Sequence, residues 1–299
     1  MITRGTAPDI YDVAFQDIYS EEWQQITGEW EPIFTLETSK KKSEKYSSLT
    51  GFGVAVEKPE GADVELDDPY QGYDKEFTHK TFGLGFQITW EAEADDQFGK
   101  MKELPRGLAR SLAEKPELDT AAIFNNAFTS GTGGDANYLC ASDHANESGG
   151  STGSNVLATP ADLSFTSLKT ALTQMRKMTN ARGIYIALKP EIVLIPPDLE
   201  FDLEQILNST LAPGVSVNDI NSVRRKYSLT PHQMTRITDP DCWFLLATQR
   251  RDLKFIWRQK PGDLLSDRYV SSRTREYNDV ERYSLGWTGW RFILGTPGA

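Results

Sequence analysis

The residues with the clearest potential for chemistry in this 299-residue chain are few and scattered. Cys140 and His144 lie four residues apart, a spacing that would suit two ligands of a zinc ion. A zinc site also needs further cysteine or histidine ligands, and the sequence offers no second pair at such a spacing. We therefore expect a buried cysteine and a polar histidine in a loop, and no metal site.

Other signatures of catalysis are missing from the sequence. It has no P-loop, no Gly-x-Ser-x-Gly and no His-Glu-x-x-His, and Gly51-Phe52-Gly53 lacks the third glycine and the following helix of a dinucleotide-binding motif. The acidic pairs Asp67-Asp68 and Asp95-Asp96 could bind a cation, but a solvated loop tip and a helix N-terminus explain them more simply. We expect a protein that is not an enzyme and that needs no cofactor.

The seven tryptophans raise a different possibility, a sugar-binding site or a hydrolase. Trp287 and Trp290 flank Thr288-Gly289 near the C-terminus. Buried aromatic rings, however, dominate protein cores and interfaces, and no pair of acid and base residues accompanies these two. We therefore expect Trp287 and Trp290 to pack in a core or an interface.

The charge of the chain is spread unevenly. The net charge is −11 overall, −12 within residues 1–100 and +3 within residues 201–299. Unlike patches can steer copies of one protein together, although a solvated acidic surface is the simpler alternative. The basic runs Lys40-Lys41-Lys42 and Arg224-Arg225-Lys226 are too short for the concentrated patch of a nucleic-acid binder. No stretch approaches the roughly 20 apolar residues of a membrane span, and the two cysteines suggest no disulfide framework.

The longest element that the sequence predicts is a helical run over residues 90–128. Its apolar side chains recur at steps of three and four residues, as on one face of a helix: Phe98, Met101, Leu104, Leu108, Leu112, Ile123 and Phe124. Pro105 and Pro116 should break or kink a helix because proline lacks the backbone N–H. We expect a short helix to about Glu103 and a longer one to Phe128, with a bend or bulge near Pro116.

A long hairpin precedes this run. Residues 47–56 and 76–90 alternate as strands do, and residues 57–69 between them are strongly acidic. No neighbouring segment looks able to cover both faces of the hairpin, and an isolated hairpin is only marginally stable in water. We therefore expect it to lie on another subunit.

The remaining segments predict an α+β chain without internal repeats. Residues 9–27 predict a helix, residues 129–161 a linker or irregular loops, and residues 162–179 a helix capped by Ser164 or Asp162. Strands are expected over 184–196, 241–247 and 253–259 and within 268–294, with a helix from Asp198 through Leu207.

This order of elements resembles the major capsid proteins of tailed bacteriophages, which have the Hong Kong 97-type shell fold, and is most similar to Mu-like major head subunits. The resemblance covers essentially the whole chain and rests on local segments as well: DDQFGKMKELPRGLARSLA, IFNNAF, LCASDHANESGGSTGSN, PEIVLIPPDLE, DPDCWFLLA and GWTGWRFILG.

The resemblance implies a division of the chain and a function. The segments would be an N-arm at 1–46, an extended hairpin or E-loop at 47–89, a P-domain with its spine helix at 90–183, an A-domain at 184–261 and return strands of the P-domain at 262–299. The protein would be a structural subunit that self-assembles into the icosahedral head shell around double-stranded DNA. An encapsulin-like nanocompartment shell protein is the alternative.

The resemblance also implies partners. These would be further copies in hexamers and pentamers, portal, scaffold or decoration proteins, and non-specific contact with packaged DNA, in a virion assembled in the host cytoplasm without a membrane. For contacts between subunits we expect side chains of the arm, the hairpin and the second basic run: Trp23, Lys58, Asp67, Asp68, Tyr70, Phe77, Arg224 and Arg225.

Overall fold

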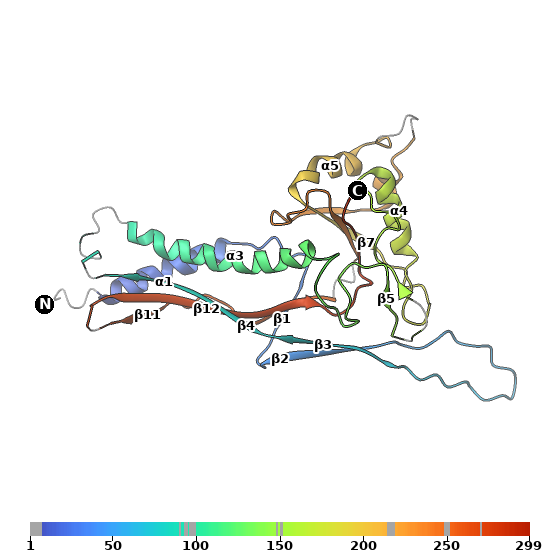
Figure 1. Cartoon of the computed structure of the whole chain (residues 1–299), viewed down its shortest axis with the longest axis horizontal. Helices are drawn as coiled ribbons and strands as arrows, with labels where there is room; N and C mark the ends of the chain where they lie inside the picture. The colour runs from blue at the N-terminus through green and yellow to red at the C-terminus, as the bar shows by residue number, and fades with distance from the viewer. Residues whose placement is uncertain are drawn as a thin grey trace.

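The structure is a computed structural model that describes residues 8–89, 91–92, 95, 100–147, 149, 152–213, 219–247, 252–269 and 271–299. It combines a long flat part, a compact part at one end of it and a hairpin that projects beyond both (Figure 1). Several residues of the predicted long helical run, among them Trp90, Asp96 and Phe98, lie outside the described residues.

The long part is a sheet covered by helices on one face. Its strands are β1 (Thr35–Thr38), β4 (Lys80–Ile88), β10 (Leu253–Gln259), β11 (Leu265–Arg268) and β12 (Arg275–Trp287). The strands β10 and β11 pair with opposite ends of β12, and β4 pairs with nine residues of β12 that overlap both. Because β4 shares its partners with both strands, it lies on the other edge of β12. Side chains of β12 alternate between buried and half-buried, as expected for a strand with one covered face.

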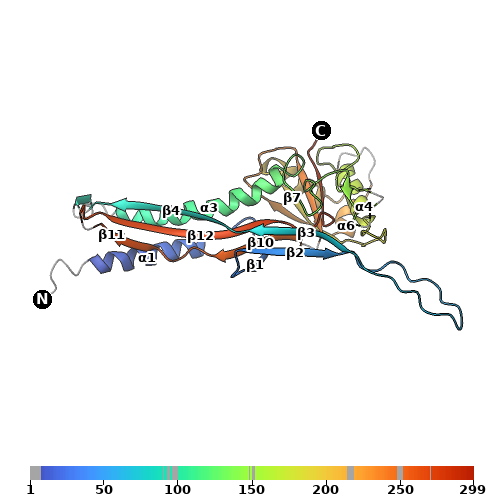
Figure 2. The same cartoon turned by 60° about the horizontal axis from the view of Figure 1, so that its bottom comes forward.

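Helices α1 (Pro8–Gln25) and α3 (Glu103–Asn125) lie along this sheet (Figures 1 and 2). The predicted boundary at about Glu103 is confirmed, since α3 begins at that residue, but neither Pro105 nor Pro116 breaks the helix. Pro105 sits in the first turn of α3, where its missing N–H has no partner to lose, and the helix continues through Pro116 to Asn125 instead of Phe128. Of the predicted short helix, the described residues include two helical residues at 91–92 and a 3₁₀ turn, η1 (Lys100–Lys102).

The hairpin differs from the prediction in its strands. Its base is formed by β2 (Ser43–Leu49) and β3 (Gln71–Thr78), so the first strand lies earlier than residues 47–56. The expected second strand over 76–90 is divided at His79, because β3 pairs with β2 whereas β4 pairs with β12. Alternation of side chains shows that a segment is extended but does not identify its partner.

The compact part contains a second sheet and shorter helices. Its strands β7 (Pro190–Ile195), β8 (Thr230–Gln233), β9 (Trp243–Ala247) and β13 (Ile293–Thr296) lie in the order β13-β9-β7-β8. Its helical elements are α4 (Phe165–Arg176), η2 (Pro197–Leu199), α5 (Glu200–Asn208) and α6 (Ser222–Lys226), and β5 (His144–Ala145) pairs with β6 (Thr152–Gly153). The predicted strand over 184–196 is shorter, since it begins at Pro190. Ser164, not Asp162, caps α4 by accepting the N–H of Ser167 at 3.1 Å.

The two sheets share one hydrophobic core. A single cluster joins Ile192 and Phe244 of the compact sheet to Phe255 and Tyr283 of the long sheet, and Trp30 stacks on Phe255 with ring centroids 4.0 Å apart. The continuous core holds the compact part at a fixed place on the long part. Among the described residues, no helix is both long and apolar enough to cross a membrane.

Candidate assembly interface

The distal hairpin, residues 50–70, projects from the fold (Figures 1 and 2). Within the described residues 50–70, no β-ladder joins the two strands. The exposed apolar side chains of the hairpin are Leu49, Phe52, Val54, Val56, Val64, Leu66 and Tyr70, with Leu66 92% exposed. Several large apolar side chains exposed within one short segment are typical of a surface that contacts another molecule.

The returning segment of the distal hairpin would present two different sides if it is extended. In an extended chain, Val64 and Leu66 point to one side, and Asp63, Glu65 and Asp67 point to the other. Residues 57–68 contain six acidic residues and one lysine, Lys58. The tip therefore offers a partner an apolar edge beside a row of carboxylates.

Arg182, in the loop after α4, holds the hairpin partway along its length. Its Nη2 donates to Asp67 Oδ1 at 3.2 Å and to the backbone oxygen of Asp68 at 2.8 Å, and its guanidinium lies 4.5 Å from the centre of the Tyr70 ring. The N–H of Gly53, together with Arg182, lowers the pKa of Asp67 below its ordinary value. The three predicted contact residues Asp67, Asp68 and Tyr70 thus meet at one cation of their own subunit, and residues 54–66 extend beyond it.

The base of the hairpin is fastened to the fold by side chains that the sequence did not single out. Ser48 Oγ donates to Glu147 Oε1 at 3.1 Å. Within the base, Lys45 of β2 pairs with Asp74 of β3 at 2.7 Å, which lowers the pKa of Asp74 to about 2. Phe77 is 4% exposed and packs with Tyr46 and against Gly286, so its side chain is not available to a neighbour. The expectation that Phe77 makes an inter-subunit contact is wrong for this reason.

The other predicted contact residues have different surroundings. Trp23 is half-buried and packs in the cluster of Tyr19, Leu108 and Leu112, between α1 and α3. Lys58 is exposed in the distal hairpin. Trp23 therefore has a packing role within its own subunit, while Lys58 is free to meet another one.

Arg224 and Arg225 are exposed on α6 and border a cavity of about 350 Å³ between α5 and the segment that follows α6. Arg224 Nη1 donates to the backbone oxygen of Asn208 at 2.7 Å. Glu204 of α5 also lines the cavity, so the lining contains one carboxylate beside its basic side chains. The structure places these arginines on the compact part, in a helix that lies about 150 residues after the acidic hairpin in the sequence.

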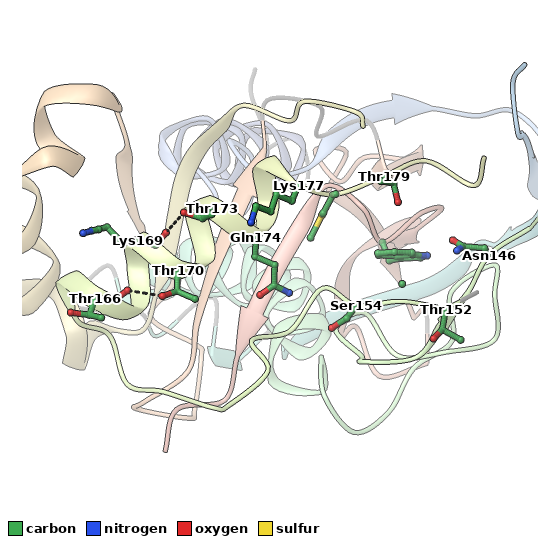
Figure 3. Close-up of a pocket in the computed structure, with 13 residues that line it drawn as sticks. Asn146, Thr152, Ser154, Thr166, Lys169, Thr170, Thr173, Gln174, Lys177 and Thr179 are labelled. Carbon is green, nitrogen blue, oxygen red and sulfur yellow. Dashed lines mark hydrogen bonds between the residues drawn. The ribbon is translucent and has the colours of Figure 1, made fainter. Parts of the chain in front are cut away.

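A larger cavity, of about 590 Å³, lies against α4 and was not anticipated from the sequence (Figure 3). We call it the α4 groove. Its lining combines Lys169 and Lys177 with polar and a few apolar residues: Asn146, Thr152, Gly153, Ser154, Thr166, Thr170, Thr173, Gln174, Met178, Thr179 and Trp290. The helix was predicted, and the signal that could have pointed to the groove is the run of lysines and threonines on its exposed face.

The residues considered for metal or sugar binding are engaged within the core. The Nδ1 of His144 lies 2.5 Å from Asp135 and its Nε2 lies 3.1 Å from Asn155, so both ring nitrogens already have partners. Burial raises the pKa of the Cys140 thiol. Trp290 stacks on His144 and is 6% exposed, and Trp287 is also buried, so neither ring offers a face to a sugar. Across the described ranges, no cluster of three or more potential metal ligands occurs.

A buried carboxyl group lies where α3 meets the sheet. Glu281 of β12 is 0% exposed, and both carboxyl oxygens are without a hydrogen-bond partner among the described residues. Burial and the nearby carboxylates of Asp119 and Asp279 raise its pKa to about 8. Those two carboxylates accept hydrogen bonds from Tyr283 and Tyr19, each at 2.7 Å.

Comparison with known proteins agrees with this architecture. A family model described as phage capsid protein matches residues 72–295. Among curated proteins, none matches the sequence.

Solved capsid structures share the fold at low sequence identity. The capsid structure of cyanophage P-SCSP1u is 10% identical with a TM-score of 0.60, and the match covers 89% of this chain and 86% of that chain. The procapsid of bacteriophage JBD30 is 16% identical with a TM-score of 0.51, covering 99% and 76%. A virus-like particle from Pyrococcus furiosus is 9% identical with a TM-score of 0.53, covering 94% and 97%.

Proposed function

Because this chain belongs to the phage capsid protein family, we propose that its projecting hairpin joins each subunit of the head shell to a neighbour. The protein is a structural subunit of a phage head shell, located in the capsid of the virion. The observation that carries the proposal is the distal hairpin, which projects from the fold and exposes several apolar side chains within one short segment (Figure 1). Burying this surface against a second copy would stabilise the shell at about 25 cal/mol for each Å² removed from water.

The mechanism is the sum of many weak contacts over a symmetric lattice. Hexamers and pentamers would close the shell, with residues 184–261 as the axial A-domain. Residues 90–183 and 262–299 would form the P-domain, and residues 1–46 and 47–89 the arm and the E-loop. The sheets support this division only in part, since β10 pairs in the long sheet and β13 in the compact sheet.

The family supports further proposals about the setting of the shell. It would assemble in the host cytoplasm with a portal and a scaffold or decoration protein, and it would enclose double-stranded DNA through non-specific contacts. It would have no enzymatic activity, in keeping with a structural role.

The role of the distal hairpin can be tested by replacing residues 54–66 with a Gly-Ser segment of equal length. This change keeps β2, β3 and the contacts of Arg182 while removing the apolar and acidic side chains of the tip. We expect a folded subunit, with an unchanged circular dichroism spectrum, that yields few closed particles in light scattering and electron microscopy.

A matched control carries the single substitution Arg176→Ser at an exposed position of α4, which leaves the whole hairpin in place and should assemble normally. Normal particles from the Gly-Ser variant would show that the side chains of residues 54–66 are not needed to join subunits, and would contradict the proposal.

An encapsulin-like compartment remains the second candidate, because the virus-like particle from Pyrococcus furiosus shares the fold over nearly the whole chain. Electron microscopy of particles isolated from their natural source separates the two. DNA-filled heads with tails support the first candidate, and smaller shells loaded with protein support the second.

A further inference from the structure

The α4 groove has a lining of one electrostatic sign. Among the described residues that line it, Lys169 and Lys177 are positively charged and none is an aspartate or a glutamate. Neither ammonium group has a carboxylate partner within the part of the chain that the structure describes; Lys169 lies over the ring of Phe165 at 5.4 Å. The groove would therefore favour an anionic occupant.

The lining also offers hydrogen bonds along its length. Figure 3 shows Thr166, Lys169, Thr170, Thr173 and Lys177 following α4 on one side, with Ser154, Thr152 and Asn146 across from them. The hydroxyl groups of Thr170, Thr173 and Ser154 already donate to backbone oxygens of their own subunit, so they offer mainly acceptor lone pairs for the N–H groups of an extended chain. The floor is apolar where Met178 and Trp290 reach it.

The distal hairpin has the complementary features. Residues 57–68 are strongly acidic, carry the exposed Val64 and Leu66, and lack a ladder that would pair their backbone groups. Arg182 holds the hairpin of the same subunit at Asp67 and Asp68 while residues 54–66 stay exposed, so a subunit does not fill its own groove with its own tip. An occupant from this protein must come from a second copy.

The dimensions of the two elements agree. Lys169 and Lys177 are eight residues apart, which is about 12 Å along a helix. Four residues of extended chain cover about 13 Å, so a segment such as 62–66 is long enough to pass both lysines. The cavity beside α6 is a weaker match, because it is smaller and Glu204 lines it.

We propose that the α4 groove of one subunit receives the acidic tip of the hairpin of a neighbouring subunit. The proposal rests on the proposed function and names the surface on which the hairpin acts. Asp63 and Glu65 are about 7 Å apart along an extended chain, so the flexible side chains of Lys169 and Lys177 would converge on their carboxylates from the two ends of the segment. Leu66 would lie toward the apolar floor.

A charge-reversal experiment on the full chain tests the proposal. The double variant Lys169→Glu, Lys177→Glu should lower the yield of closed particles about tenfold, because like charges would then face each other across the contact. Adding Asp63→Lys and Glu65→Lys to the same chain should restore most of the yield. The control Arg176→Glu changes an exposed residue of the same helix outside the groove and should assemble normally.

The possible outcomes separate this proposal from the proposed function. Normal assembly of the double variant would overturn the groove as a docking site, while the Gly-Ser tip variant would still report on the hairpin. A double variant that assembles normally but retains less DNA would assign the groove to phosphate groups and would also overturn the proposal.

A second measurement does not depend on yield. Particles assembled from a mixture of Leu66→Cys and Thr173→Cys subunits should give a disulfide-linked dimer on oxidation with glutathione disulfide. Mixed particles of Leu66→Cys with Thr238→Cys, a cysteine on another exposed loop, should give none. Absence of the first dimer in well-formed particles would contradict the proposed docking.

Discussion

Glu281 is a buried residue that should lower the free energy of unfolding as the pH rises. Its carboxyl group is buried beneath α3 with Asp119 and Asp279 nearby, and burial keeps it protonated to about pH 8. In the unfolded chain the same group ionises with its ordinary pKa of about 4.5. The unfolded state therefore releases this proton first as the pH rises, and the free energy of unfolding falls between about pH 4.5 and pH 8.

Replacing Glu281 with glutamine should remove this dependence. We expect Glu281→Gln to raise the free energy of unfolding by up to about 3 kcal/mol at pH 7, since each pH unit above the unfolded pKa is worth about 1.4 kcal/mol. Urea denaturation of unassembled subunits at pH 5, 6, 7 and 8 would measure it. The exposed Asp263→Asn variant is the control for a lost charge, and an equal slope in Glu281→Gln and the parent chain would contradict the assignment.

Residue-level expectations from the sequence succeeded where one side chain's type was decisive. The placement of Trp287 and Trp290 in the core followed from their large apolar area. The case of Phe77 failed because its burial depends on Gly286 and Tyr46, which come together only when strands distant in the chain are paired. The contact of the Arg182 side chain with Asp67 and Asp68 was not predicted for the same reason, since these partners lie 115 and 114 residues earlier in the chain.

At the scale of elements, periodicity located most helices and strands but not their partners. The helix over 162–179 and the strands over 241–247 and 253–259 were close to α4, β9 and β10. The division of one extended segment into β3 and β4 at His79 could not be predicted, because both halves alternate in the same way. The prolines correctly indicated a helix boundary at Glu103 but not a break, since a first-turn proline is tolerated and tertiary packing retains the helix at Pro116.

Arg182 is one of the contacts that hold the hairpin, and it is the one nearest the tip. We expect Arg182→Ala to change the free energy of unfolding by less than about 1 kcal/mol, because surface ion pairs contribute little. The same change should speed hydrogen exchange of residues 50–53, since Asp67 then loses the cation that helps to hold it against the N–H of Gly53.

Hydrogen–deuterium exchange followed by mass spectrometry measures this effect, and Arg176→Ala serves as the control on a neighbouring exposed arginine. Exchange in the hairpin that is equally slow in both variants would show that Arg182 does not hold it.

At the scale of the whole molecule, the arrangement of the compact part, the long sheet and the projecting hairpin determines which surfaces are available to other subunits (Figure 2). A shared core fixes the compact part to the long sheet, while the distal hairpin leaves the fold with an apolar and acidic surface (Figure 2). The order of elements and the local segments together predicted the shell fold, which the family model and solved capsids support. The α4 groove could not be predicted, because its two sides come from α4 and from the loop around β5 and β6.

The most direct test of the central claim is a cryo-electron microscopy map of particles formed by the full-length protein. The account predicts a closed shell in which density for residues 54–66 lies against a neighbouring subunit and covers Val64 and Leu66. A shell in which these residues contact only their own subunit, or remain exposed at every position, would contradict it.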